Sequence, residues 1–155
     1  MKKGAIKANC LEPSITHNWM NMYDITTKNL VQQWGGWLNS FEWDYFSTIT
    51  YKFDISPRRN ESLMLELEKR LIKEVPIHNM FWVMEHTSNG YQTHNHLLLS
   101  GDGSRYEVDR FLSERKLVNP KFVQHSAYDS SQGATYYISK HIRSPSVKYG
   151  ISFNK

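Results

Sequence analysis

Two short apolar segments, separated by the pair Asn89-Gly90, lie near the middle of the chain. Met80–His86 and His94–Ser100 have the length and composition of β-strands, and an Asn-Gly pair between two strands is typical of a tight turn. The pattern therefore predicts an antiparallel hairpin. Because side chains alternate between the two faces of a strand, His94 and His96 share one face.

The first strand of this hairpin carries a carboxylate. Folding the hairpin can bring Glu85 opposite His94 and His96, within reach of a common ion. A register slip of one residue would offer His86 in place of Glu85, and the sequence does not decide between the two. We interpret Glu85, His94 and His96 as ligands of a divalent metal ion. Such a set suits Mn²⁺ or Zn²⁺, with Mg²⁺, abundant in cells, as an alternative, and it leaves positions for water and a phosphate oxygen.

The rest of the chain predicts helices and strands around this hairpin. Ser56-Pro57 is a favourable helix start, and Ser104 with Glu107 forms a capping box at the start of another helix. The order β-α-β-β-α-β-α-β predicts an α+β fold in which helices pack on one antiparallel sheet. Beyond the hairpin, we expect helices at 24–38, from 57 to the residue before Pro76, from 104 through 112 and at 132–142, and strands at 44–53, 120–128 and 147–153.

Size and composition indicate one globular domain. The 155 residues suffice for one core, and 39% hydrophobic with 22% charged residues is an ordinary globular balance. The one cysteine, Cys10, cannot form an internal disulfide, which favours a reducing cytoplasm. The basic start of the chain has no apolar segment after it, and no apolar run approaches the roughly 18 residues of a membrane span. We therefore expect neither a secretory signal nor a membrane partner.

Positive charge is concentrated towards the C-terminal end. Residues 116–155 contain six Lys or Arg and one Asp, whereas residues 1–115 contain 13 Lys or Arg against 14 Asp or Glu. A basic end on a near-neutral body fits contact with a polyanion such as nucleic acid, although charge alone fits an ordinary solvated surface equally well. The candidate backbone contacts are Lys116, Lys121, Arg143 and Lys148.

The last predicted helix carries a candidate nucleophile. With Ile138 at the centre of its buried stripe, 100° per residue places Tyr137 on the flank beside His141, and Tyr136 nearly opposite the core. A nucleophile that faces an ion on the sheet should flank the packing stripe, which favours Tyr137 with Lys140 three residues later. Tyr136, four residues before Lys140, remains an alternative. Lys140 and a nearby ion would both favour the phenolate form of the tyrosine.

Three segments carry these candidates in a fixed order. The first is 46–51, Phe-Ser-Thr-Ile-Thr-Tyr, in which Thr48 and Thr50 alternate with apolar residues. The second is 93–99, in which two histidines surround one residue, and the third is Tyr137-Ile138-Ser139-Lys140. In composition, order and spacing these segments resemble motifs I, II and III of the HUH endonucleases, specifically of the initiator proteins of rolling-circle plasmids and viruses. The middle residue of motif II is usually bulky and apolar in that family, so Asn95 is a departure.

The resemblance implies a five-stranded antiparallel sheet of ferredoxin-like or RNA-recognition-like topology in residues 41–155, with residues 1–40 as an N-terminal extension. It also implies a third metal ligand from the strand before motif II, which matches Glu85. Tyr137, or else Tyr136, is then expected to attack single-stranded DNA at an origin and form a 5′-phosphotyrosine link, with Lys140 as a supporting charge. The chain has no Gly-x-x-x-x-Gly-Lys-Ser/Thr loop, so a separate helicase and polymerase are expected partners.

Two other functions remain open from the sequence. Single-tyrosine transposases of the same superfamily share the motif order and the small size. A non-catalytic module could use the same His, Tyr and Lys side chains only to contact nucleic acid. If Tyr137 is the one nucleophile, termination is expected to need Tyr136 or the second subunit of a homodimer. The expected location is the cytoplasm of the host cell of a virus or plasmid.

Overall fold

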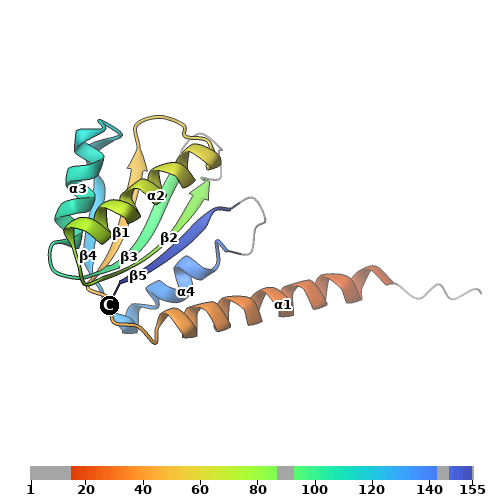
Figure 1. Cartoon of the computed structure of the whole chain (residues 1–155). Helices are drawn as coiled ribbons and strands as arrows, with labels where there is room; N and C mark the ends of the chain where they lie inside the picture. Colours follow the sequence, from red (N-terminus) through yellow and green to blue (C-terminus); the bar gives the residue numbers. More distant parts are fainter. Residues whose placement is uncertain (1–14, 87–92, 143–146, 155) are drawn as a thin grey trace, which may run out of the picture.

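The computed structural model describes residues 15–86, 93–142 and 147–154. Five antiparallel strands form one sheet in the order β4-β1-β3-β2-β5, and helices lie on both of its faces (Figure 1). The predicted α+β fold with a central five-stranded antiparallel sheet is therefore confirmed. The strands are β1 (Tyr45–Tyr51), β2 (His78–His86), β3 (Thr93–Ser100), β4 (Val118–Ala127) and β5 (Tyr149–Asn154); the helices are α1 (Ile15–Leu38), α2 (Pro57–Glu74), α3 (Ser104–Glu114) and α4 (Ala134–Ser139), with a 3-10 turn, η1 (Ser130–Gln132).

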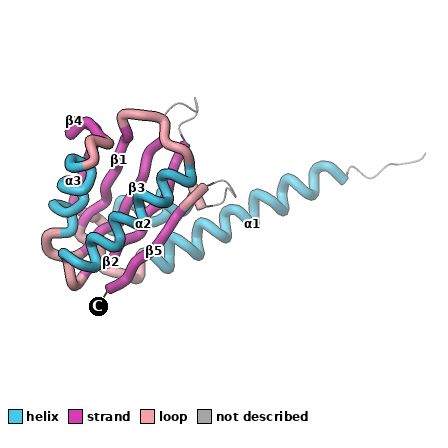
Figure 2. The backbone as a smooth tube through the Cα atoms, turned by 45° about the horizontal axis from the view of Figure 1, so that its top comes forward, coloured by secondary structure: helices cyan, strands magenta, loops and turns pink. Residues whose placement is uncertain are grey.

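Helices α2 and α3 cover one face of the sheet (Figures 1 and 2). Helix α2 starts where the sequence predicts: the side chain of Ser56 accepts a hydrogen bond from the backbone N–H of Arg59 at 3.2 Å, and Pro57 occupies the first turn. Leu63, Leu67 and Leu71 recur at helical spacing and are fully buried against the sheet, whereas Leu65 is exposed. This larger of the two cores includes Leu63, Leu67 and Leu71 of α2, Phe111 and Leu112 of α3, and Trp82, Leu97 and Leu99 of the strands.

The opposite face is covered by α4 and the last turns of α1. Leu38 of α1 and Ile138 of α4 are fully buried there, so the end of the predicted extension is part of the domain core. Helix α1 begins at Ile15 rather than at residue 24, and its N-terminal part extends away from the sheet (Figures 1 and 2). Although α1 has 24 residues, no helix in the described ranges is both long and apolar enough to cross a membrane.

The central hairpin has the register that places a carboxylate beside the histidines. Glu85 of β2 is paired with His94 of β3, and His86 is paired with Thr93. The alternative register, in which His86 takes the place of Glu85, is therefore not the one observed. The predicted turn at Asn89-Gly90 lies outside the described residues.

Helix α3 starts differently from the prediction. Its N-cap is Gly103, which has a left-handed φ of 85°, and no side chain caps this end. Ser104 is instead the first residue of the helix and is fully buried, with no hydrogen-bond partner for its hydroxyl within the described residues. Glu107 lies 2.9 Å from Arg70 of α2 and 3.1 Å from Arg110. The predicted capping box is therefore wrong, because α2 supplies a stronger partner for Glu107 than the backbone of its own helix.

Helix α4 is shorter than the prediction of 132–142. It follows η1 and Gly133, which has a positive φ of 69°, and it ends at Ser139. The chain then continues in a turn, in which the backbone N–H of His141 donates to the carbonyl of Ile138 at 3.3 Å. As a result, His141 is not on a helix flank but in the segment that leaves the helix next to the sheet.

Candidate metal centre and nucleophile

Two imidazoles and a carboxylate converge beside the end of the central hairpin. Glu85 of β2, His96 of β3 and His141 after α4 each offer a ligand atom, and these three atoms lie within 4.8 Å of one another. Nε2 of His96 is 2.6 Å from Oε2 of Glu85, and Nε2 of His141 is 3.5 Å from the same oxygen. Imidazole nitrogens and a carboxylate oxygen are donors that Mn²⁺ and Zn²⁺ accept, so this group could hold a divalent metal ion.

The structure brings together two of the three predicted ligands. Glu85 and His96 belong to the group, whereas Nδ1 of His94 is 2.9 Å from Oγ1 of Thr50 and the ring of His94 is not one of the three. His94 nevertheless lies on the same face, across from Glu85 in the strand register. Its participation as a ligand stays a prediction.

His141 supplies the second imidazole, which was not among the ligands predicted from the sequence. The sequence does place His141 four residues after Tyr137, on the same flank of the predicted helix. This spacing is a signal from which His141 could have been predicted as a ligand. The difficulty is physical: His141 is 45 residues from His96 in the sequence, and only the packing of α4 on the sheet brings the two rings to 5.5 Å from each other.

Threonines of β1 hold the two histidines of β3. In the β1–β3 register Thr48 is paired with His96, and Thr50 is paired with His94. Oγ1 of Thr48 lies 3.2 Å from Nδ1 of His96, and Oγ1 of Thr50 lies 2.9 Å from Nδ1 of His94. A hydrogen bond at Nδ1 fixes the ring orientation and directs Nε2 towards an ion. The strand that resembles motif I thus supports the site directly.

The ionisation of the group suits a cation. Burial lowers the pKa of His96 below its ordinary value, and the nearby Glu85 carboxylate only partly counteracts this effect, so the ring is neutral at pH 7. Burial by itself raises the pKa of Glu85, but the hydrogen bond with His96 and the charges of His141, His96 and Lys140 together lower the pKa overall. A neutral imidazole beside an ionised carboxylate is the form in which these side chains bind metals.

Tyr137 lies next to this group. The centre of its ring is 5.4 Å from the ring of His96 and 5.6 Å from the ring of His141, edge-on in each case. Nζ of Lys140 is 3.6 Å from the centre of the tyrosine ring. Because the Tyr137 side chain is still 42% exposed, a substrate can reach it.

The phenol of Tyr137 is protonated at neutral pH in this environment. Burial, and to a smaller extent the negative charge of Glu85, raise the pKa of Tyr137 above its ordinary value of 10. The expectation from the sequence considered Lys140 and an ion, both of which favour the phenolate. The carboxylate acts in the opposite direction, so a cation that balances the charge of Glu85 would favour ionisation of this phenol.

Tyr136 has a different environment. Its ring packs directly against Gly35 of α1, so closely that a Cβ at position 35 would overlap the ring, and its hydroxyl lies near Gly36. Gly35, which weakens α1 as an isolated helix, makes room for this contact. Tyr136 therefore joins α4 to α1, and of the two candidate nucleophiles only Tyr137 borders the histidines.

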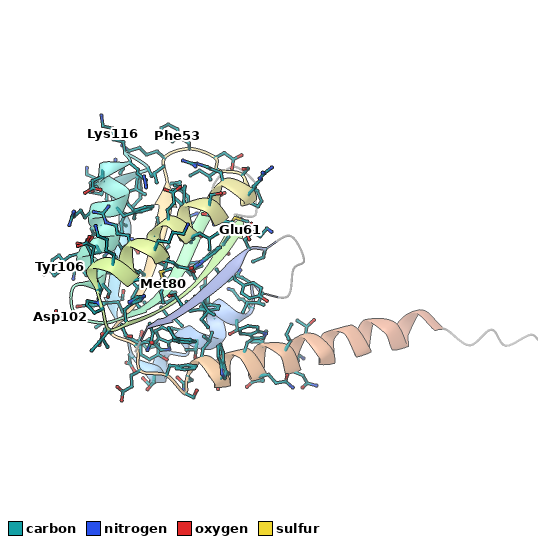
Figure 3. All side chains as sticks on the ribbon, viewed as in Figure 1. Phe53, Glu61, Met80, Asp102, Tyr106 and Lys116 are labelled. Carbon is teal, nitrogen blue, oxygen red and sulfur yellow. The ribbon has the colours of Figure 1, made fainter. Side chains whose placement is uncertain are left out.

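The predicted DNA-binding cations fall into three groups. Lys116 and Lys121 are exposed around the start of edge strand β4, and neither makes an ion pair within the ranges that the structure covers. Figure 3 shows Lys116 and Phe53 projecting from the same end of the molecule. Lys148 is 3.3 Å from Glu61 of α2. Arg143 lies outside the described residues.

Comparison of the chain with protein-family models, with curated proteins and with solved structures gave no match. The site is therefore interpreted from its own geometry and from the motifs in the sequence.

Proposed function

We propose that the protein nicks and rejoins single-stranded DNA at a replication origin through a 5′-phosphotyrosine intermediate, as an initiator of rolling-circle replication. The observation that carries this proposal is the position of Tyr137, 5.4 Å from the ring of His96 and in contact with the ammonium group of Lys140. A tyrosine that only covers a sheet needs neither a lysine nor a cluster of metal-ligating groups beside it. The order of the three motifs in the sequence supports the same function.

In the proposed reaction Oη of Tyr137 attacks the phosphorus of the scissile phosphodiester, and the bond from phosphorus to the 3′ oxygen breaks. The phenol gives up its proton and the leaving 3′ oxygen takes up a proton, so the products are a 5′-phosphotyrosine and a free 3′-hydroxyl. Because the new linkage is again a phosphodiester, attack by a 3′-hydroxyl can reverse the step and rejoin the strand. Lys140 stabilises negative charge that develops on the phenol oxygen.

The residues present fit a divalent metal ion. Glu85 and His96, with His141 or His94, would hold Mn²⁺ or Mg²⁺, with Zn²⁺ as an alternative. When bound, such an ion supplies positive charge that polarises the scissile phosphate. The same charge would balance the Glu85 carboxylate, which otherwise opposes ionisation of Tyr137.

The proposed partners are DNA, a helicase and a polymerase. Lys116 and Lys121 contact the DNA backbone, and Lys148 can do so where it is released from Glu61. Unwinding and synthesis belong to a separate helicase and polymerase of the host cytoplasm. A second subunit provides a further tyrosine where termination requires one.

The experiment that tests the proposal is the detection of a covalent protein–DNA adduct. The full chain is incubated with Mn²⁺ and a labelled library of single-stranded oligonucleotides, and the products are separated by denaturing electrophoresis. We expect a labelled band at the size of the protein plus DNA, and its loss in chelator. An adduct that is unaffected by chelator would overturn the metal assignment. Binding without any adduct would instead support a non-catalytic nucleic-acid module.

A further inference from the structure

The apolar side chains of the central hairpin do not by themselves determine which face of each strand lies under α2 and which lies under α4. Leu97, Leu98 and Leu99 follow one another in β3 and are all fully buried, alternately under α2 and under α4. The same is true of the apolar segment 80–84 in β2, which is at most 1% exposed. With a leucine or another large apolar side chain on both faces, a one-residue slip of β3 would still bury apolar surface. Some other feature must define the register.

The polar end of β3 contains such a feature. Between the two histidines, the side chain of Asn95 is fully buried on the opposite face, towards α2. Its Nδ2 donates to Oδ1 of Asn60 at 2.6 Å and to the hydroxyl of Tyr51 at 2.7 Å, and its Oδ1 accepts from Nδ2 of Asn60 at 3.0 Å. Asn60 is also fully buried, and Tyr51 is 2% exposed. The three side chains join β3 to α2 and to β1 inside the apolar core.

We propose that Asn95, Asn60 and Tyr51 form a register lock, which keeps His94 and His96 on the face that carries Glu85 and Tyr137. A slip of one residue would turn Asn95 towards that face, leave Asn60 and Tyr51 without their buried partner, and move the imidazoles into the leucine-rich core. Each of these changes is costly, because buried polar groups need hydrogen-bond partners. These three are positioning residues; none of them borders the metal group, and the inference rests on the proposed function for its catalytic meaning.

The chemistry of the network indicates that it selects the register of β3 rather than adding to the stability of the fold. Two amides and a hydroxyl in an apolar core give little net stabilisation, and apolar residues of similar size at such positions are often neutral or stabilising. The best-attested benefit of isolated buried polar groups is a fixed register between neighbouring elements. A buried polar side chain at Asn95 suits this hairpin, because leucines line both faces of β3 and the apolar pattern alone does not define the register.

The test replaces the network with apolar side chains in the full-length protein, as Asn95→Leu combined with Asn60→Leu and Tyr51→Phe. We expect this variant to fold with a Tm no lower than that of the wild type. We also expect the imidazole NMR signals of His94 and His96 to appear in more than one set, and the affinity for Mn²⁺ to fall by about tenfold or more. Ser47→Ala is the matched control, since Ser47 is also a fully buried polar residue but its hydroxyl bonds His125 of β4 rather than a member of the network.

The outcome that overturns the register lock is a triple variant with one set of histidine signals, an intact contact between Thr50 and His94, and wild-type affinity for Mn²⁺. Should the triple variant not fold, Asn60→Ala alone gives the decision, because it removes the amide pair and should also split the signals. The NMR readout separates this inference from the proposed function. A wild-type protein that binds no Mn²⁺ contradicts the metal site, while the register is still measured.

Discussion

At the residue level, the geometry of the candidate metal site depends on hydrogen bonds to the side of each histidine ring that faces away from the site. His96 receives contacts on both ring nitrogens, from Thr48 at Nδ1 and from Glu85 at Nε2. An ion can replace the second contact but not the first. Thr48 of β1 therefore sets the orientation of the His96 ring, although the histidine itself is in β3.

This arrangement gives a prediction for Thr48. Thr48→Val keeps the shape of the side chain but removes the hydroxyl that holds His96, so we expect the affinity for Mn²⁺, measured by calorimetry, to fall by about 10- to 100-fold. Ser126→Ala, an exposed change on β4, should leave the affinity unchanged. If Thr48→Val and the wild type bind Mn²⁺ with equal affinity, Thr48 does not orient His96 for metal binding.

The charge of Glu85 gives a second prediction at this scale. Burial depresses the pKa of His96 below its ordinary value of 6.5, and Glu85 raises it in part. In Glu85→Gln, an NMR titration of the metal-free protein should therefore give a still lower pKa for His96. The pKa of Tyr137 should also fall in this variant, because the carboxylate raises it. A rise of either pKa would contradict the electrostatic description of the site.

At the scale of helices and strands, the elements that the sequence predicts best are those whose signals are local. Helix α2 has its N-cap, its proline and its leucine spacing within one segment, and the β2–β3 hairpin has the alternation that places His94 and His96 together. The start of α3 and the role of His141 depend on contacts between distant segments. Glu107 bonds Arg70 of another helix, and no pattern within α3 itself reports this.

Arg70 is the main polar contact between α2 and α3. Its Nε lies 2.9 Å from Glu107, and its two terminal nitrogens lie 2.6 and 3.1 Å from the carboxylate of Glu114. The hydrogen bonds from Arg70 and Arg110 lower the pKa of Glu114 to about 2. A depressed carboxylate pKa stabilises the folded state above the ordinary pKa of 4.5, and this contribution disappears as the pH falls towards 2.

The prediction is that Arg70→Ala lowers the Tm at pH 7, and that its difference from wild type becomes smaller as the pH decreases from 4.5 to about 2. Thermal unfolding followed by circular dichroism over this pH range provides the measurement. The control is Lys73→Ala on the same helix, because the ion pair of Lys73 with Glu74 is exposed and should matter less. A Tm difference that does not change with pH would argue against ion pairing as its cause.

In the molecule as a whole, one face of the sheet carries the larger core and the other carries the candidate site. The face under α2 and α3 is closed by the larger core and by ion pairs between these helices. The other face carries the histidines, the carboxylate and Tyr137 beside the smaller core. Lys116 and Lys121, which make no ion pair within the described ranges, lie at the edge of this layered structure, where a polyanion can approach.

The distribution of ion pairs predicts which lysines control DNA binding. Lys121→Ala should make the salt dependence of single-strand binding shallower, by about 0.7 in the slope of log K against log salt concentration. Lys148→Ala should change it less, because Lys148 is already paired with Glu61. Fluorescence anisotropy with a labelled oligonucleotide at several salt concentrations compares the two. Equal effects of both changes would show that the pairing in the free protein does not matter for binding.

We propose that Tyr137, and not Tyr136, forms the covalent bond with DNA. The most direct measurement is adduct formation by Tyr137→Phe and by Tyr136→Phe, with Mn²⁺ and a single-stranded substrate that the wild type cleaves. We expect Tyr137→Phe to abolish the adduct while DNA binding stays within about twofold of wild type, since the change removes only one hydroxyl from an exposed ring. Tyr136→Phe should retain the adduct, because that ring packs on Gly35. A full yield of adduct from Tyr137→Phe would contradict the account.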